Sequence, residues 1–461
     1  MTTDNRTVAA ISTPPGKGGV ALIRISGDSA IEIASRIFKP AGSKKVAELE
    51  SRYCAYGKIV LNGEVIDDGM LTLFRSPSSF TGENVAEICC HGGTLVSAAV
   101  LRAALAGGAI PAPAGEFTRR AYLNGKLSLS EAEAIGDLLE AKTDAQLKLA
   151  RSGADGRLSA EVSHIYQKML TLCSSIFALV DYPEEDLAEL GEEEMLEILS
   201  DVQSRLLTLC DSYSSARVIT EGISTVICGA ANTGKSTLYN ALAGKDLAIV
   251  TDIEGTTRDT LSCEVALGDV LLCINDTAGI RESNDAVERI GIERSIAAIE
   301  DSSLILCVFD GSRELKEQDI SIIDRIQRAQ GKCAIALINK GDVGVVCDTD
   351  IIKNAFEHVL FISAKNGDGI NELSSLLHSL YISDKLDLSN GAILQNARQS
   401  ACALAALDAV NDAYRALCDK MPPDMAACDV ERAMSALGEL DGQSVSEDIT
   451  NEIFSKFCVG K

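Results

Sequence analysis

Residues 229–236 form a glycine-rich segment of the kind that binds phosphate. The segment reads Gly-Ala-Ala-Asn-Thr-Gly-Lys-Ser. In such a loop the glycines let backbone N–H groups close around phosphates, Lys235 can neutralise the β- and γ-phosphate oxygens, and the Ser236 hydroxyl can ligate magnesium. These residue types predict a site for a nucleoside triphosphate with Mg²⁺.

A second motif, Asn339–Asp342, predicts which base the nucleotide carries. It reads Asn-Lys-Gly-Asp. The carboxylate of Asp342 can accept hydrogen bonds from both N–H groups at one edge of guanine, whereas adenine has no such pair of donors. Adenine would leave this carboxylate unpaired, which disfavours an ATPase. We therefore expect GTP.

The surrounding segments follow the order that a phosphate site needs. The apolar run 224–228 is typical of a buried strand, and 237–242 is typical of the first turns of a helix. That helix would bring its positive N-terminal end to the phosphates. Another apolar run, 270–274, leads into Asp-Thr-Ala-Gly, where Asp276 can hold the magnesium shell and Gly279 can approach the γ-phosphate.

Two more segments complete the predicted GTP site. Thr257 lies in a switch segment, Gly-Thr-Thr-Arg-Asp, and is placed to complete the magnesium ligands. Ser363–Lys365 follows the apolar run 358–362 and can donate a backbone N–H to the guanine oxygen. These elements in this order predict a GTPase domain.

The residue that orients the attacking water is not evident from the motifs. Ras-type GTPases use a glutamine just after Asp-x-x-Gly, but this chain has Ile280 there. The acidic stretch 282–293 is the next candidate, and a solvated helix face is the alternative interpretation of its acids.

The composition fits a chain with several buried cores. Its 461 residues suffice for about three domains, and 46% of them are hydrophobic. The sequence has no apolar run of about eighteen residues and no basic-then-apolar N-terminus, so we expect a soluble, cytoplasmic protein. The fifteen cysteines include no Cys-x-x-Cys, so we expect most to be small core residues, with Cys458 near the chain end as the exception.

Pattern changes predict a multidomain chain. Residues 1–122 mix β-rich and helical runs, which predicts an α+β domain. Residues 123–217 have helical spacing, 218–383 alternate strands and helices as a doubly wound Ras-like α/β P-loop domain, and 384–461 are helical again. The GTPase domain is thus expected to be inserted between two halves of a helical domain, through which its movements could reach the rest of the chain.

From end to end, the chain resembles the MnmE (TrmE) family of tRNA modification GTPases. The resemblance rests on motifs within residues 13–19, 23–27, 79–83, 91–93, 113–118, 123–135, 250–259 and 457–461. The last of these is the terminal Phe-Cys-Val-Gly-Lys. The phosphate loop departs slightly from the family pattern, with Ala231 and Thr233 where proline and alanine are usual, and Val459 stands where isoleucine is commoner.

For GTP hydrolysis, the resemblance implies that a potassium ion replaces the arginine finger. It assigns this ion to Asn232, Thr251, Ile253 and Thr256, and the orientation of the attacking water to Glu288. A monovalent cation there can neutralise transition-state charge. The full set of predicted GTP contacts is Asn232, Thr233, Gly234, Lys235, Ser236, Thr237, Thr251, Asp252, Ile253, Glu254, Gly255, Thr256, Thr257, Asp276, Thr277, Ala278, Gly279, Asn339, Lys340, Asp342, Ser363, Ala364 and Lys365.

For the N-terminal domain, the resemblance implies dimerisation and binding of a tetrahydrofolate one-carbon donor, either 5-formyl- or 5,10-methylene-tetrahydrofolate. The motifs place the folate contacts at Arg24, Glu87, Lys126 and Lys461. These side chains suit a pterin edge that donates hydrogen bonds and a tail that presents carboxylates. Cys458 would lie close to the one-carbon chemistry.

The resemblance also implies partners. It predicts a homodimer that works with an MnmG-like FAD protein, in a heterotetramer or larger complex, on the wobble uridine of tRNA. The net charge of −25 argues against broad contact with tRNA phosphates. We therefore expect the partner to supply most of the basic surface.

The alternative is a ribosome-assembly or RNA-binding GTPase related to Era or Der. It would share the nucleotide motifs, so only the flanking segments discriminate. An Era-like chain would carry a basic KH-type domain after the GTPase domain, and a Der-like chain a second GTPase domain. The acidic helical C-terminal segment fits neither.

Overall fold

The computed structural model of the chain describes residues 6–181, 190–244, 263–274, 302–328, 332–382, 388 and 391–460. The chain divides into two compact units. One unit comprises residues 1–136, 154–203 and 405–461, and the other comprises residues 137–153 and 204–404.

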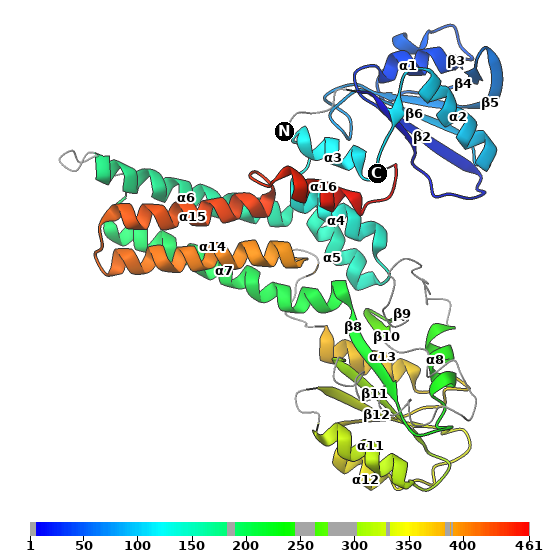
Figure 1. Cartoon of the computed structure of the whole chain (residues 1–461), viewed down its shortest axis with the longest axis vertical. Coiled ribbons are helices and arrows are strands. Elements are labelled where there is room, and N and C mark those ends of the chain that lie inside the picture. The colour runs from blue at the N-terminus through cyan, green and yellow to red at the C-terminus, as the bar shows by residue number, and fades with distance from the viewer. Residues whose placement is uncertain are drawn as a thin grey trace. The chain divides into compact units, whose positions relative to one another are not determined.

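The first unit contains a sheet whose two faces differ. Its strands are β1 (Val8–Ile11), β2 (Val20–Ser26), β3 (Phe38–Pro40), β4 (Cys54–Leu61), β5 (Glu64–Phe74), β6 (Val85–His91) and β7 (Ile110–Pro111), in the order β3-β4-β5-β6-β2-β1-β7. Only β1 and β7 pair in parallel. Helices α1 (Ala30–Ile37) and α2 (Thr94–Ala106) pack on one face, where Ile23, Leu71 and Ile88 are fully buried (Figure 1). Because side chains alternate along a strand, Arg24 and Glu87 lie on the opposite face.

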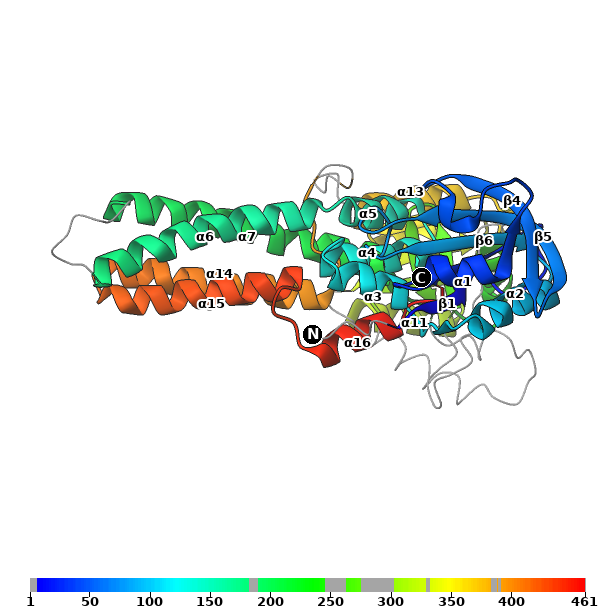
Figure 2. The ribbon, with the colours of Figure 1, turned by 90° about the horizontal axis from the view of Figure 1, so that it is seen from above.

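The rest of this unit is helical. Helices α3 (Glu116–Leu123), α4 (Leu129–Glu140), α6 (Arg157–Asp181), α15 (Pro423–Asp441) and α16 (Glu447–Ser455) belong wholly or mainly to it, and α7 (Glu192–Glu221) and α14 (Ala397–Cys418) continue into the second unit. Buried residues on α6 recur every three or four positions, at Leu158, Val162, Ile165, Met169 and Leu172. That spacing gives one apolar stripe, and α6 lies side by side with α15 in Figures 1 and 2.

The second unit is a doubly wound sheet. Its strands are β8 (Ile223–Cys228), β9 (Cys263–Leu267), β10 (Val270–Ile274), β11 (Leu304–Asp310), β12 (Cys333–Asn339) and β13 (His358–Phe361), in the order β13-β12-β11-β8-β10-β9. All neighbours are parallel except β9 and β10. Helices α8 (Lys235–Ala243) and α13 (Ile370–Tyr381) cover one face, and α11 (Glu317–Arg328) and α12 (Thr349–Ala355) cover the other. Helix α5 (Asp144–Ala154) also belongs to this unit.

The fold class expected from the sequence is confirmed: an α+β domain, a helical domain and a Ras-like α/β P-loop domain. Every residue of β11 is buried, as expected for the centre of a parallel sheet covered on both sides. Among the described residues, none of the helices is both long and apolar enough to cross a membrane.

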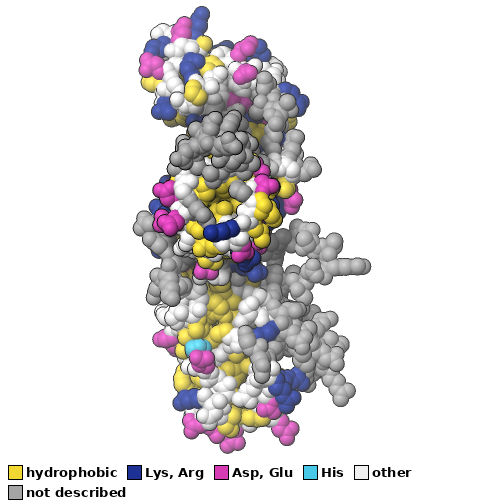
Figure 3. All heavy atoms as spheres, turned by 90° about the vertical axis from the view of Figure 1, so that its left-hand side faces the viewer, with side chains coloured by type: hydrophobic (Ala, Val, Ile, Leu, Met, Phe, Trp, Pro, Cys, Tyr) yellow, Lys and Arg dark blue, Asp and Glu magenta, His cyan; other side chains and the backbone are white. Residues whose placement is uncertain are grey.

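On the face shown in Figure 3, the described acidic and basic side chains are interspersed. All fifteen cysteines are described, and none forms a disulfide. Six of the fifteen are buried and five are half-buried, whereas Cys458 is exposed and so are Cys54, Cys418 and Cys428. The expectation of a single exception was therefore wrong, because strand and helix periodicity turns these three side chains outward.

Candidate functional site

The phosphate loop follows β8 and ends in α8, as predicted. Gly234 and Asn232 have left-handed backbones, with φ of 96° and 61°. A Cβ at Gly229 would overlap the carbonyl oxygen of Val308 on β11, so only glycine fits there. The loop conformation therefore depends on its glycines.

Lys235 is tethered within this loop. Its Nζ donates to the carbonyl oxygens of Gly229 at 2.9 Å and Ala230 at 2.8 Å. Burial lowers the pKa of Lys235 from its ordinary value. Ser236 and Thr237 follow in the first turn of α8 and are exposed. A cation, a hydroxyl and a helix N-terminus thus meet at one place, which is the chemistry of a phosphate site.

Asn339 connects the phosphate loop to the base-recognition motifs. Its side chain donates from Nδ2 to the carbonyl oxygen of Thr233 at 2.8 Å and accepts at Oδ1 from the backbone N–H of Ala364 at 2.9 Å. Asn339 is only 3% exposed. One buried amide therefore holds three predicted elements of the GTP site in register.

Asp342 and Lys340 are each held by a neighbouring side chain. Ser363 Oγ donates to Asp342 Oδ1 at 2.9 Å, and Lys340 Nζ pairs with Asp310 Oδ2 at 2.6 Å. Burial alone would raise the pKa of Asp310, but hydrogen bonds from Lys340 and Ser312 outweigh it and lower that pKa. The predicted residue Lys365 is exposed beside this group. The exposed Asp342 carboxylate is thus positioned to accept from a base.

Part of the predicted GTP and folate sites lies outside the described residues. These positions are Thr251, Asp252, Ile253, Glu254, Gly255, Thr256, Thr257, Asp276, Thr277, Ala278, Gly279, Glu288 and Lys461.

On the sheet of the first unit, Arg24 and Glu87 form a cross-strand pair. They are register partners on β2 and β6, and Arg24 Nε donates to Glu87 Oε1 at 2.8 Å. Their side chains are 17% and 21% exposed. The Arg24 guanidinium lies 5.9 Å from the ring centre of Phe80 and 5.4 Å from that of Phe117. The pair can therefore present a fixed, partly desolvated array of donors and acceptors.

Lys126 approaches the same region through the turn at residues 76–84, which joins β5 to β6. Lys126 Nζ donates to the carbonyl oxygen of Pro77 at 3.3 Å, and a Cβ at Gly82 would lie 3.3 Å from Lys126 Cγ. Phe80, which contacts Arg24, belongs to the same turn. The structure thus gathers Arg24, Glu87 and Lys126 around one segment.

The C-terminal segment docks against the start of α3. Ala114 and Val459 form an antiparallel bridge, and the backbone N–H of Gly115 donates to the carbonyl oxygen of Cys458 at 3.4 Å. Gly460 has φ of 95°, and a Cβ there would overlap the carbonyl oxygen of Ile11. The exposed thiol of Cys458 is therefore held at a defined place on the first unit.

Replacing Gly460 by alanine is expected to loosen this segment. A left-handed alanine is strained, and the new Cβ would also push against β1. Amide exchange at Cys458 and Val459 is expected to rise by about tenfold, which corresponds to about 1.4 kcal/mol of local opening. Gly42→Ala is the matched control, since a Cβ there meets nothing within 4 Å. Unchanged exchange in Gly460→Ala would contradict this docking.

Several residues around these sites were not predicted. They are Phe80, Phe117, Arg120 and Asp310. The segments 79–83 and 113–118 were recognised as family motifs, but nothing in their spacing indicated that they meet beside Arg24.

The fold and the nucleotide site together define a P-loop protein specific for a guanine nucleotide. Two family models match the chain. The model described as "GTP-binding protein TrmE N-terminus" matches residues 7–126, and the "MnmE helical domain" matches residues 129–458. The chain belongs to the MnmE family of tRNA modification GTPases, and it is accordingly a GTPase.

Relatives in this family are similar over the whole chain. The tRNA modification GTPase MnmE of Acetivibrio thermocellus is 40% identical over 459 residues, which cover 99% of each chain. MnmE of Clostridioides difficile is 37% identical, again over 99% of each chain. MnmE of Bacillus subtilis is 38% identical over 99% of this chain and 100% of its own length.

Solved structures are similar over smaller parts. A variant of Aquifex aeolicus Era bound to GDP·AlF4⁻ is 24% identical, covers 40% of this chain and 65% of its own, and has a TM-score of 0.27. The G domain of the T. maritima FeoB iron transporter is 19% identical, covers 34% of this chain and 98% of its own, and has a TM-score of 0.26.

Proposed function

We propose that this GTPase is activated by potassium and acts in the cytoplasm with an MnmG-like FAD protein. Together they add an aminomethyl or carboxymethylaminomethyl group to C5 of the tRNA wobble uridine. A tetrahydrofolate derivative supplies the one-carbon unit. The chain acts as a homodimer within a heterotetramer or larger complex, and tRNA is bound mainly through the partner. Residues 1–122, 123–217, 218–383 and 384–461 are its functional segments.

In the nucleotide site, each of the predicted side chains has one proposed role. Lys235 neutralises phosphate charge, and Ser236 with Thr257 holds magnesium, for which hydroxyl oxygens are suitable ligands. Asn232, Thr251, Ile253 and Thr256 hold potassium, and Glu288 orients the water. The exposed, left-handed Asn232 next to the buried Thr233 supports the first of these potassium contacts.

The potassium role is tested by GTP hydrolysis in potassium and in sodium at equal ionic strength. An increase of about tenfold or more in potassium is expected, because a cation near the γ-phosphate can replace an arginine finger. Asn232→Ala should remove this difference, whereas Asn371→Ala, at an exposed position on α13, should keep it. Equal rates in both salts would overturn the potassium part alone.

The observation that carries the folate proposal is the Arg24–Glu87 pair. An arginine held by a glutamate and two aromatic rings on a half-open sheet face fits a heteroaromatic ring that both donates and accepts hydrogen bonds. Lys126 and Lys461 supply positive charge for the carboxylate tail. Cys458 is proposed to act beside the bound folate.

Glu87→Gln is expected to weaken binding of 5-formyl-tetrahydrofolate by about tenfold to a hundredfold. One hydrogen bond to a charged group is worth about 1.5–3 kcal/mol. Isothermal titration calorimetry of the full-length protein would measure the effect. Glu64→Gln, at the exposed start of β5, is the control. If the variant matched the parent protein, Glu87 would have no place in the site.

A further inference from the structure

The turn at residues 76–84 sets the geometry of the proposed folate site. Its Phe80 ring contacts Arg24, and its Pro77 carbonyl accepts from Lys126. Phe80 is 41% exposed, so its ring has surface left for a ligand. Any shift of this turn would move Phe80 and the support of Lys126 together.

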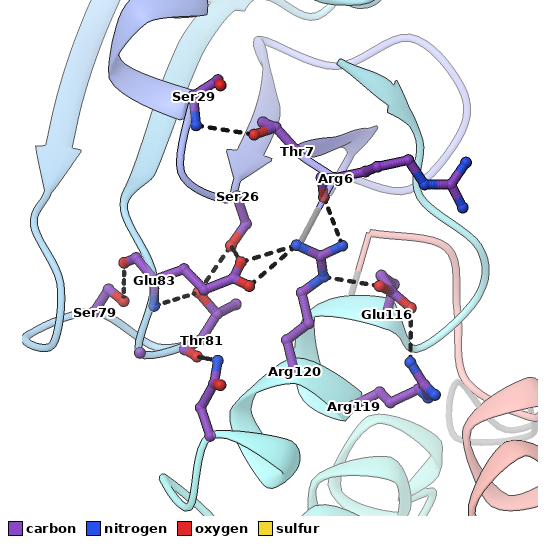
Figure 4. A network of polar contacts seen from close by, with 12 residues as sticks. Arg6, Thr7, Ser26, Ser29, Ser79, Thr81, Glu83, Glu116, Arg119 and Arg120 are labelled. Carbon is purple, nitrogen blue, oxygen red and sulfur yellow. Dashed lines mark hydrogen bonds and ion pairs between the residues drawn. The ribbon is translucent and has the colours of Figure 1, made fainter. Parts of the chain in front are cut away.

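Arg120 of α3 clamps this turn. Its Nη1 donates to both carboxylate oxygens of Glu83, at 3.2 and 3.0 Å, and its Nε donates to Glu116 Oε1 at 2.8 Å (Figure 4). Its Nη2 donates to the carbonyl oxygen of Arg6 at 2.9 Å. The Arg120 side chain is only 3% exposed. One buried guanidinium therefore ties the turn to α3 and to the segment before β1.

Further bonds extend the clamp to β2. Ser26, two residues after Arg24, donates from Oγ to Glu83 Oε2 at 2.7 Å, and its Oγ lies 2.8 Å from Thr81 Oγ1 (Figure 4). Asn124 Nδ2 donates to the Thr81 carbonyl oxygen at 2.7 Å. The turn is thus fixed against the strand that carries Arg24.

Helix α3 also carries the second aromatic contact of Arg24. Phe117 is fully buried, with its ring centre 5.4 Å from the Arg24 guanidinium, and it lies one helical turn from Arg120. Arg120 therefore shares an element with Phe117 and is bonded to the turn that bears Phe80. The clamp thus connects the two elements that carry the aromatic neighbours of Arg24.

Burying the charges of this cluster costs desolvation free energy, which indicates that the cluster has a use beyond stability. Glu83 and Glu116 face Arg120, and Arg119 Nη1 lies 3.9 Å from Glu116 Oε2, so the charges balance. Buried ion pairs add little stability, because desolvation offsets their attraction, but they can impose one conformation. A pre-organised conformation matters most where a ligand must bind.

We propose that Arg120 is a positioning residue for the folate site: through Glu83 it holds Phe80 as the surface on which the planar pyrimidinone ring of a tetrahydrofolate derivative stacks. This inference depends on the proposed folate function. An arginine is suited to the task because its rigid fork bridges two carboxylates, whereas lysine offers a single point charge.

The test uses the absence of tryptophan from the chain. Phe80→Trp in the full-length protein places the single tryptophan beside Arg24, and its emission is followed during titration with 5-formyl-tetrahydrofolate. We expect saturable quenching. Adding Arg120→Lys is expected to raise Kd by about tenfold and to change the unliganded emission maximum, while Arg102→Lys, at an exposed position on α2, changes neither. GTP hydrolysis in the other unit should be unaffected.

A second variant separates positioning from loss of folding. If Arg120→Lys lowers the melting temperature of the first unit so far that it is unfolded at the assay temperature, Glu83→Gln is used instead, because it keeps the shape and removes one charge. A Kd within about twofold of the parent in a folded variant would overturn the role of the clamp. Emission unchanged by ligand, while calorimetry detects binding, would overturn stacking on Phe80. No calorimetric binding by the unsubstituted protein would overturn the folate function itself.

Discussion

Replacing Asp342 by asparagine is expected to change the base preference of the nucleotide site from guanine to xanthine. A carboxylate can accept from two N–H groups of guanine, whereas an amide offers one acceptor and one donor group. Xanthine has a carbonyl where guanine has an amino group, so it complements the amide. GTP binding should fall as XTP binding appears.

The size of the loss follows from two charge-assisted hydrogen bonds. Each is worth about 1.5–3 kcal/mol, so GTP affinity should fall by about a hundredfold or more. The substitution should change base recognition alone, because Ser363 Oγ donates to Asp342 Oδ1 at 2.9 Å and an asparagine carbonyl oxygen can accept the same bond. The substituted side chain should therefore keep its position.

Competition of GDP and XDP against a fluorescent guanine nucleotide would measure this change in base preference. Asp348→Asn is the matched control. Asp348 caps α12 by accepting from the N–H groups of Asp350 and Ile351, and asparagine caps equally well. Unchanged preference for GDP in Asp342→Asn would mean that another group recognises the base.

The GTPase core could be predicted from sequence because its chemistry is local. Lys235 and Ser236 lie next to the strand and helix that position them, so the motif and its geometry occupy adjacent residues. The apolar runs that predicted β8, β10 and β13 were also local patterns. Here the spacing of residue types nearly determines the site.

The proposed folate site could not be predicted in this way. Arg24 and Glu87 are 63 residues apart in the sequence, and their pairing depends on strand order and register, which no local pattern determines. A family resemblance named both residues, but their direct contact became evident only in the fold. The role of Arg120 could not be predicted either: Glu116 lies one turn before it on α3, but its pairing with Glu83, 37 residues away, depends on the fold.

Asn339→Ala is expected to disable the nucleotide site although Asn339 lies 106 residues from Thr233 in the sequence. The substitution leaves the carbonyl of Thr233 and the N–H of Ala364 without their buried partner. Each unsatisfied group costs about 1–3 kcal/mol, so GTP affinity should fall by about thirtyfold or more. Without this amide, the phosphate loop and the guanine-recognition loop would no longer be held in a fixed position relative to one another.

Fluorescent GTP binding and thermal unfolding of the second unit would measure the two consequences. Asn366→Ala is the control, since Asn366 is an exposed position in the neighbouring loop. A Cβ at Gly234 would overlap Asn339 Nδ2, so Gly234→Ala should displace the Asn339 amide and cause the same loss of GTP binding. Normal GTP binding by Asn339→Ala would refute the connecting role of Asn339. If Gly234→Ala alone lost GTP binding, backbone strain at Gly234 would explain that loss.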